Sequence, residues 1–596
     1  MRLLLGLVYS AAIPLGEAPD EADHFAYAAY IAQEHRLPEG AWMTQAKHPP
    51  LYHALAALVA GPLGMDAGFL RANPDVGFTP DASPNFFIHT TVESWPWRDG
   101  PLAMHLARLI SVLAGVGLVA ATYVLGLAIW PGWPAGALAA AAFVAFLPES
   151  LFVGGALSND MLAAFLATMA LWAGMRSRRF WQAILTGILM GLGLWAKVSV
   201  AALWPVVCLA MVARGCDGRR RTTDDRPATE DGGRETEDGR RAAILWWQPW
   251  GLAIVAGGVA LLVTAPWFLR NRQLYGDWMG WPLVLATIDR RTGPFGLVEL
   301  AWLLRGLFLG FWGKFGGAGH IALPWPFYAL WAALVGASAL GWLRRICEST
   351  NQRINESTNR PSSIVHRQSA IVLLGAPLMT IAWLITYSRV ALGTDQGRLL
   401  FPAIAPLALL LVGGLAQWLP STWGEHEARW LTGWTGLMGA VAVSALMTGL
   451  VLPFAPPAEP SAVAVAGAAP LAQAFEGGLE LVGYQWGSAP AAAAPDRALT
   501  LYWRVDRLTD ADLRTSLRLT DAGGAMLWEW KRSPGAGRFS TDRWPLSRVV
   551  ADTYRVPSDS LGRAAQLVVG VRPFPEGPWL RLDDGASSLT LPAPRQ

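Results

Sequence analysis

The chain has 596 residues, of which 53% are hydrophobic and 15% are charged, and its mean hydropathy is +0.31. That much apolar sequence exceeds the needs of a water-soluble core, so long stretches of the chain are expected to lie in a lipid bilayer. A formal net charge of +3 without a concentrated basic stretch excludes a nucleic-acid partner, and three cysteines suggest no disulfide framework.

Apolar runs long enough to cross about 30 Å of hydrocarbon recur along the first 455 residues. We count about eleven of them, with residues 297–312 as a twelfth candidate that either re-enters the membrane or lies at its surface. The first run has no clear basic start and no small-residue cleavage site, so it is expected to be an anchor. The runs lie near residues 1–16, 102–129, 134–149, 159–175, 180–195, 197–214, 244–268, 322–343, 369–388, 399–418 and 430–453.

Basic residues in the short loops orient these predicted helices. If the N-terminus is cytoplasmic, the basic loops after residue 175, at 214–243 and after residue 343 all fall on the cytoplasmic side. The polar segments 217–241 and 348–359 are then expected to be disordered cytoplasmic inserts. An odd number of spans places the C-terminus outside the membrane, together with a first outer loop at 17–101.

The pattern changes after a linker at 456–475 that is rich in Ala and Pro. From there, short segments alternate apolar and polar residues, as in Leu499, Leu501, Trp503 and Val505. This period of two predicts about eight strands in an extracytoplasmic antiparallel β-sandwich over residues 476–596. Its tryptophans form either a sugar platform or core, and the core reading is favoured; they are Trp528, Trp530 and Trp544.

The first outer loop opens with an acidic sequence directly after the first apolar run. Asp20 and His24 are four residues apart and therefore share one face of a predicted helix, with Glu21 beside that face. One interpretation is a helix start whose acidic residues match the helix dipole. A second is a carboxylate that acts as a general base at the membrane surface. A third is a metal site made by Asp20, Asp23 and His24.

Further along this loop, Lys47 and His48 precede a double proline, and Tyr52 follows in an apolar helical stretch. The prolines fix the backbone and present the two basic side chains in a defined direction. The simpler alternative is an ordinary helix start, with a lysine that anchors to lipid headgroups.

Other polar residues lie where an apolar span meets the outer face, namely Asp160, Lys197, Arg270, Tyr275 and Arg398. Charged groups at such depth are costly, so they tend to be paired or functional. The basic ones either anchor to headgroups or together supply the cations that bind a lipid-linked phosphate.

Taken in order, these motifs resemble those of the GT-C glycosyltransferases, and in particular the bacterial members related to protein O-mannosyltransferases and to the lipid A aminoarabinose transferase. The likeness covers about residues 1–450. Each motif is only a few residues long, but all face the same side. They are Asp20-Glu21, Pro49-Pro50-Leu51-Tyr52, Ser158-Asn159-Asp160, Ala196-Lys197, Arg270-Asn271 with Tyr275-Gly276-Asp277, and Gly397-Arg398.

The resemblance implies an inverting transfer of a sugar from a polyprenyl-phosphate donor to an acceptor hydroxyl, with Asp20, or its neighbour Glu21, as general base. Related chains often have Lys-Pro-Pro where this one has His48-Pro49-Pro50, so either Lys47 or His48 is expected to bind the phosphate. The chemistry requires no cofactor, and a divalent metal, although compatible with it, is not indicated. The expected phosphate ligands are Lys47, His48, Lys197, Arg270 and Arg398, and the expected sugar or acceptor ligands are His24, Tyr52, Asp160 and Tyr275.

The sequence thus predicts a polytopic α-helical membrane protein of the bacterial plasma membrane. A GT-C-like domain of 11 to 12 transmembrane helices spans residues 1–455 and precedes the β-sandwich. The partners would be the lipid-linked donor, membrane lipid and a glycan, lipid or protein acceptor. A transporter or flippase for lipid-linked saccharides is the first alternative, but its midplane site and internal repeats are not evident. A non-catalytic scaffold is the second, although one or two spans would be enough for it.

Overall fold

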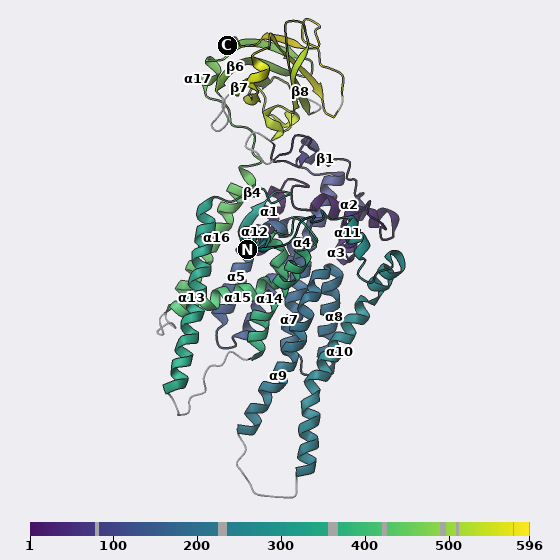
Figure 1. Ribbon diagram of the computed structural model, residues 1–596, viewed down its shortest axis with the longest axis vertical. Helices are drawn as coiled ribbons and strands as arrows, with labels where there is room; N and C mark the ends of the chain where they lie inside the picture. The colour runs from purple at the N-terminus through teal and green to yellow at the C-terminus, as the bar shows by residue number, and fades with distance from the viewer. Residues whose placement is uncertain are drawn as a thin grey trace.

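The structure, a computed structural model, describes residues 1–77, 83–224, 235–355, 367–419, 426–488, 496–507, 512–575 and 577–594. Helices form a long bundle, and most of the strands gather in a compact unit at one end of it (Figure 1). We call that unit, residues 469–592, the β domain. The chain is therefore predominantly helical with a β-rich C-terminal part.

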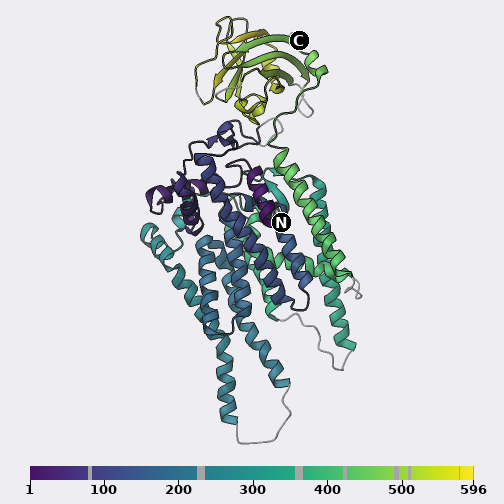
Figure 2. The same ribbon diagram turned by 180° about the vertical axis from the view of Figure 1, so that it is seen from behind.

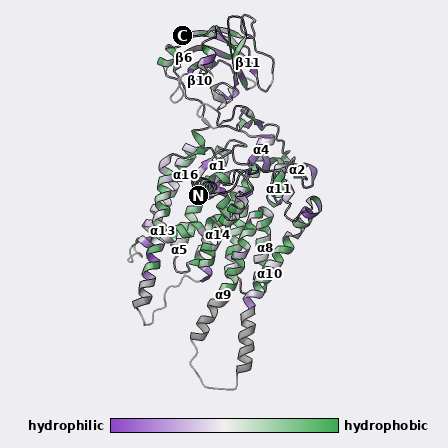
Figure 3. Ribbon diagram, viewed as in Figure 1, coloured by the Kyte–Doolittle hydropathy of each residue, from purple (hydrophilic) through white to green (hydrophobic). Residues whose placement is uncertain are grey.

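The bundle begins with the short helix α1 (Arg2–Ala12), and the helices α2 (Glu21–Glu34) and α3 (Leu51–Ala60) follow in the first outer loop. The rest of the bundle consists of α4 (Asp99–Ile129), α5 (Pro134–Phe146), α6 (Pro148–Gly155), α7 (Asp160–Arg176), α8 (Phe180–Ala196), α9 (Trp204–Asp224), α10 (Glu235–Tyr275), α11 (Trp281–Ala286), α12 (Leu297–Gly313), α13 (Trp325–Asn355), α14 (Arg367–Ser388), α15 (Ile404–Leu415) and α16 (Glu427–Leu446). Hydrophobic residues follow the bundle helices, whereas hydrophilic ones are frequent around α2 (Figure 3).

Six helical segments in the described residues are long and apolar enough to cross a membrane, which identifies an integral membrane protein. They are Asp99–Ile129, Gln248–Tyr275, Trp325–Glu348, Arg367–Ser388, Gly397–Trp418 and Glu427–Val451. A seventh is obtained if α5 and α6, which meet at a bend of 55°, form one broken span. The predicted count of 11 to 12 is not confirmed, because several of the predicted runs form shorter apolar helices. The 17 residues of α8, for example, extend over about 26 Å, less than the hydrocarbon thickness.

The predicted cytoplasmic inserts are helical at their edges. Helix α9 continues to Asp224 and α10 begins at Glu235, while α13 continues to Asn355. The remaining parts of these inserts, residues 225–234 and 356–359, lie outside the described residues.

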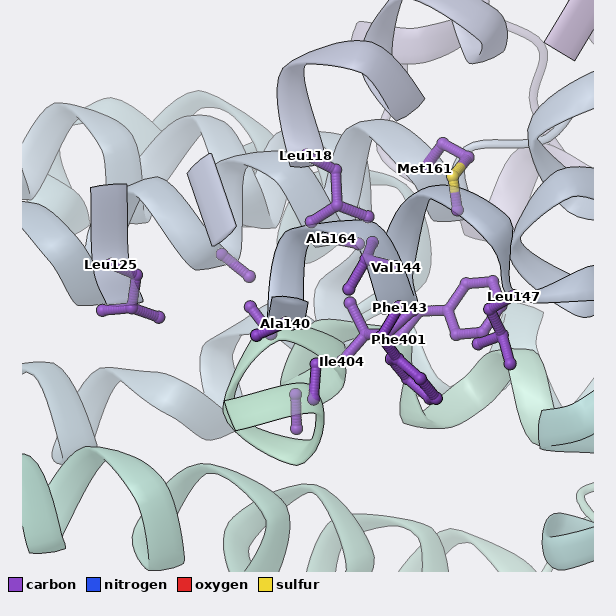
Figure 4. Close-up of a cluster of buried hydrophobic side chains, with 14 of the residues drawn as sticks. Leu118, Leu125, Ala140, Phe143, Val144, Leu147, Met161, Ala164, Phe401 and Ile404 are labelled. Carbon is purple, nitrogen blue, oxygen red and sulfur yellow. The ribbon is translucent and has the colours of Figure 1, made fainter. Parts of the chain in front are cut away.

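A core of small and medium-sized side chains joins the central helices. Figure 4 shows Leu118 of α4, Phe143 of α5, Met161 of α7 and Phe401 in one buried cluster. Helix α5 contributes a run of buried alanines, whose small side chains allow neighbouring helices to approach closely. Met161 follows Asp160 in the sequence, and Phe401 follows Arg398 by three residues. By fixing Met161 and Phe401, this core also sets the positions of the two charged residues.

The β domain contains two four-stranded antiparallel sheets. One has the order β10-β7-β6-β5 and the other the order β12-β11-β8-β9. Alternate residues of β7 are fully buried, and they belong to one hydrophobic cluster with residues of the second sheet. The strands are β5 (Ala469–Phe475), β6 (Leu479–Ser488), β7 (Arg497–Val505), β8 (Leu513–Thr520), β9 (Met526–Arg532), β10 (Val549–Val556), β11 (Gln566–Pro573) and β12 (Leu589–Pro592).

Two details of this domain differ from the sequence pattern. Strand β5 lies within the segment that composition predicted as a linker, because its residues pair with β6 despite their Ala and Pro content. Of the three tryptophans, Trp544 is buried in the core and Trp528 packs against it, whereas Trp530 is 44% exposed.

The first outer loop contacts the β domain directly. Arg514 of β8 forms an ion pair with Asp75 at 2.7 Å, and Asp542 accepts hydrogen bonds from the backbone and the hydroxyl of Thr91 at 2.9 and 3.0 Å. The loop that carries Asp20 therefore also holds the β domain against the bundle.

Candidate active site

Four ionic side chains from distant parts of the chain meet at one place, and we call them the charge cluster. Arg398 donates from Nη2 to Asp20 at 2.5 Å and from Nη1 to Asp160 at 3.0 Å, and Lys197 donates to the other oxygen of Asp160. Arg398 and Asp160 are buried, whereas the side chain of Asp20 is 47% exposed. Asp20 is thus the accessible carboxylate of the cluster.

Asp20 occupies the N-cap of α2 in the left-handed conformation, with φ of 61°. Aspartate tolerates this conformation better than most residues, because its short polar side chain interacts locally. Strained backbone of this kind persists only where the surroundings enforce it, and it is frequent at functional sites.

The other three members lie at the ends of helical segments. Asp160 is the first residue of α7 and accepts a hydrogen bond from the hydroxyl of Ser158 at 3.1 Å. Lys197 follows α8 directly, and Arg398 lies in the 3₁₀ turn η5 (Gly397–Ala403). Several helical segments end at this one place, which is how a mostly apolar fold assembles four charges.

Gly397 allows η5 to approach α12. A Cβ atom at this position would lie 1.8 Å from the backbone nitrogen of Phe311 and 2.1 Å from the carbonyl carbon of Gly310. Backbone therefore packs on backbone immediately beside Arg398, and only glycine fits.

The charge cluster controls the ionisation of Asp20. Burial alone would raise the pKa of this carboxyl, but the guanidinium of Arg398, with further contributions from His24 and Lys197, holds the pKa well below its usual range. Asp20 is therefore ionised at neutral pH. While Arg398 is bound to it, however, it is also a weak base.

Three histidines pack behind Asp20. His24 Nδ1 lies 2.8 Å from His53 Nε2, and the ring of His48 lies 6.2 Å from that of His24. Burial lowers the pKa of His24 to about 4, against the opposing effect of Asp20, so the imidazole is neutral. Within the described residues, no three His, Cys, Asp or Glu side chains are grouped so as to hold a metal ion.

Glu21 does not belong to the charge cluster. Its carboxylate receives two hydrogen bonds from Arg108, at 2.7 and 2.8 Å, and one from the backbone of Leu157 at 2.7 Å. The side chains of Glu21 and Arg108 are both fully buried. The structure thus places Glu21 apart from Asp20: helix α2 directs it into the bundle, where it pairs with Arg108 of α4.

Tyr52 is likewise part of the support for the site. Its hydroxyl lies 2.7 Å from that of Ser111 and accepts a hydrogen bond from the backbone of Ser158 at 3.0 Å. Because its side chain is fully buried, a sugar cannot contact it in this conformation. It fixes instead the turn that precedes Asp160.

The remaining predicted ligands surround the cluster without joining it. Lys47 donates to the carbonyl of Thr287 at 3.2 Å, Arg270 to that of Pro38 at 2.8 Å, and Tyr275 accepts from the backbone of Gly40 at 3.4 Å. Burial lowers the pKa of Lys47, and the nearby carboxylate of Asp20 acts in the opposite direction.

The sequence pattern did not single out Arg108 or His53. Arg108 could have been recognised from the sequence, because a charged residue inside an apolar run is expected to have a partner. No feature of the sequence indicated a role for His53, since its partner, His24, lies on another helix.

No protein-family model and no curated protein matches the chain. Among solved structures, ArnT from Cupriavidus metallidurans bound to undecaprenyl phosphate matches at 14% identity and a TM-score of 0.38, over 75% of this chain and 68% of ArnT. The oligosaccharyltransferase AglB from Archaeoglobus fulgidus, in complex with an inhibitory peptide and a dolichol-phosphate, matches at 11% identity and a TM-score of 0.34, over 76% of this chain and 55% of AglB. Both are GT-C glycosyltransferases, the family that the sequence motifs resemble. With TM-scores below 0.5, we infer no residue role from them.

Proposed function

We propose that the protein is a membrane glycosyltransferase that transfers a sugar from a polyprenyl-phosphate donor to an acceptor hydroxyl, with inversion, at the outer face of the bacterial plasma membrane. The observation that carries this proposal is the bridge that Arg398 makes between Asp20 and Asp160, with Lys197 on the far side of Asp160. A candidate base and two cations thus share one site.

The charge cluster suits a phosphate diester because the carboxylate of Asp20 occupies a position on Arg398 that a phosphate can take over. Asp160 remains bound by Lys197 and Arg398 in a buried position, so the two cations keep fixed directions. A donor phosphate that enters beside the half-exposed Asp20 competes for Nη2 of Arg398, and guanidinium groups bind phosphate and carboxylate with similar geometry. Donor binding would therefore release Asp20 and strengthen it as a base.

The reaction is a single displacement. The acceptor oxygen attacks the anomeric carbon of the donor, its proton passes to Asp20, and the bond from that carbon to the phosphate oxygen breaks. The leaving polyprenyl phosphate gains negative charge, which Arg398 and Lys197 stabilise more in the transition state than in the ground state. Neutral His24, one turn along α2 from Asp20, is buried with its Nδ1 2.8 Å from His53, so it supports the base from behind.

Asp20→Asn tests this proposal directly. Membranes that contain either protein receive a radiolabelled pool of polyprenyl-phosphate sugars, and transfer of label to acceptor is followed. The variant keeps the shape of the side chain but cannot accept the proton, so transfer should fall by a factor of about 10² or more.

Asp23→Asn is the matched control. Asp23 lies in the same first turn of α2, but it is exposed and accepts a hydrogen bond from Thr44 at 2.8 Å. Its variant should transfer label at nearly the wild-type rate. Equal transfer by wild type and Asp20→Asn would remove Asp20 as the base.

A further inference from the structure

A cavity of about 250 Å³ lies between the bundle and the β domain. Its walls come from the end of α1, the first outer loop, the start of α4, the segment after α16 and a loop of the β domain. In Figure 1 the β domain sits over this end of the bundle. The cavity shares no lining residue with the charge cluster, so it is a second site.

One wall of the cavity is apolar. It contains Ala12 and Ile13 at the end of α1, with Leu450, Val451 and Phe454 from the chain after α16. The candidate span Glu427–Val451 ends at this wall, so the wall lies where a membrane helix reaches the outer surface. An amphiphile could therefore place the start of its apolar tail there.

The facing wall carries hydrogen-bonding groups of both kinds. Arg538 and Arg543 come from the β domain, and Asn85 and Glu93 come from the first outer loop. The guanidinium of Arg543 lies over the ring of Phe539 at 4.6 Å. The side-chain oxygen of Asn85 is buried and has no hydrogen-bond partner in the described part of the chain.

The charges on this wall are of mixed sign. Glu93 binds His89 at 2.9 Å, so its carboxylate is partly neutralised, while the two arginines add positive charge and the nearby Asp542 adds negative charge. A ligand with a large net charge would not match such a wall. Hydroxyl groups do match it, because each hydroxyl both donates and accepts hydrogen bonds.

A stacked aromatic pair completes the lining of the cavity. Trp97 stacks on His105, with their ring centroids 3.6 Å apart, and both residues line the space. The axial C–H groups of a sugar ring pack on such surfaces while its hydroxyls point outward to polar side chains. The volume lies near the lower end for ligand pockets, about 300 Å³, which suits one small unit rather than a long chain.

From these features we infer that the cavity binds a neutral saccharide unit, either the headgroup of a glycolipid or a free sugar. The inference does not rest on the proposed transfer reaction, because its site and its measurement are separate from those of Asp20. It assigns a ligand-binding role to the junction with the β domain.

Photo-crosslinking of the full-length protein in nanodiscs tests this inference. Three diazirine probes are compared: dodecyl β-glucoside and methyl β-glucoside labelled on the sugar, and dodecylphosphocholine labelled on the headgroup. Peptides that contain residues 85–97 or 537–543 should be crosslinked by a glucoside and not by the phosphocholine. Labelling by both glucosides identifies a site for free sugar, and labelling by dodecyl glucoside alone identifies a glycolipid site.

Two variants locate the labelling. Ala11→Trp fills the cavity from an exposed position of α1, with Leu7→Trp, one turn earlier on the same exposed face, as its control. Arg543→Gln removes hydrogen bonds from a charged donor, worth about 1.5–3 kcal/mol, so labelling should fall about tenfold or more.

Three results would overturn the inference. Crosslinking by the phosphocholine at the same peptides and to the same extent would show an unselective apolar groove. Unchanged labelling in Ala11→Trp and in Arg543→Gln would place the probe elsewhere, and absence of labelling by both glucosides would leave the cavity without a saccharide ligand.

Discussion

Arg398 binds two carboxylates that lie far from it in the sequence, and this gives Asp20 two states. With Arg398 attached, Asp20 is ionised but weakly basic. When a phosphate takes over the guanidinium, the remaining influence of burial acts in the opposite direction and raises the pKa of the carboxyl. The base would thus gain strength only when the donor is present, which disfavours proton uptake in an empty site.

The pH dependence of transfer is expected to report this coupling. Wild-type kcat/KM should remain flat on the acid side down to at least about pH 4, because the low pKa keeps Asp20 ionised in the free protein. Arg398→Gln should lower the rate and also move the acid limb to higher pH, since burial then dominates the pKa. A pH–rate profile at low donor concentration measures both effects.

The exposed Arg36, which lies 3.8 Å from Glu34 and over the ring of Tyr30, provides the control for that experiment. Arg36→Gln should keep the wild-type profile. If Arg398→Gln changed the rate at every pH but left the acid limb in place, Arg398 would not control the ionisation of Asp20.

Glu21 and Arg108 are expected to contribute to stability rather than to catalysis. Glu21→Gln leaves a buried guanidinium without its counter-charge, which typically costs about 3–5 kcal/mol. Thermal unfolding in detergent should show a large loss for this variant and almost none for Glu34→Gln, whose carboxylate is exposed. Equal melting temperatures for the two variants would contradict the structural role.

The individual residues of the charge cluster were readable from the sequence, but their pairing was not. Asp160, Lys197 and Arg398 each occur where an apolar run ends, and such positions attract attention because charge is costly there. Asp20 and Arg398, however, are 378 positions apart, and they meet because Ala18, near Asp20, and Phe401, near Arg398, pack into the same core. The pairing of Glu21 with Arg108 was not readable either, because adjacent residues on a helix differ in direction by about 100° and the partner lies on another helix.

At the scale of elements, a buried ion triad joins the segment between β2 (Phe87–Ile88) and α4 to the residues that precede α2. His89 lies between Glu17 at 3.1 Å and Glu93 at 2.9 Å. Burial lowers the pKa of His89, but the two carboxylates outweigh it and raise the pKa to about 9. This triad holds the loop beside α1 and next to the junction cavity.

The sign of its effect on stability follows from that shift. Because the pKa of His89 rises from 6.5 in the unfolded chain to about 9 in the folded one, the stabilisation is complete below pH 6.5 and is lost as the pH rises through 9. Melting curves at a series of pH values should show this fall for the wild type. His89→Gln should be less stable at pH 6, by up to about 3 kcal/mol, and should show a flatter dependence.

His426→Gln serves as the control, because His426 is exposed at the start of α16. It should reproduce the wild-type pH dependence. A wild-type melting temperature that stayed constant between pH 6.5 and 9.5 would show that the triad does not hold a protonated histidine.

Helix existence was easier to predict than helix length. Apolar composition located every long bundle helix, since each buries or exposes to lipid a continuous apolar run. Composition failed at β5, where Ala and Pro residues form a strand only because β6 offers a pairing edge. Composition also could not show that α5 and α6 meet at a bend of 55° at Leu147-Pro148, since proline occurs both at helix starts and at kinks.

At the scale of the molecule, the β domain lies at one end, and the far ends of α9, α10 and α13 lie at the other (Figures 1 and 2). The ends of α9 and α13, which carry basic residues, are therefore opposite the β domain, as the positive-inside rule requires if the β domain is extracytoplasmic. Helix α2, whose N-cap is Asp20, lies toward the β domain (Figure 1), which agrees with chemistry at the outer face.

Cysteine labelling in intact cells tests this orientation. A Ser560→Cys variant, with the three native cysteines replaced by serine, should react with a membrane-impermeant maleimide from outside, because Ser560 lies in the β domain. A second protein that retains only the exposed native Cys347, near the far end of α13, should react only after the cells are permeabilised. The reversed pattern would place the β domain and Asp20 in the cytoplasm, and labelling of both cysteines from outside would mean that α13 does not cross the membrane. Because Cys347 and residue 560 occupy opposite ends of one chain, each protein serves as the control for the other.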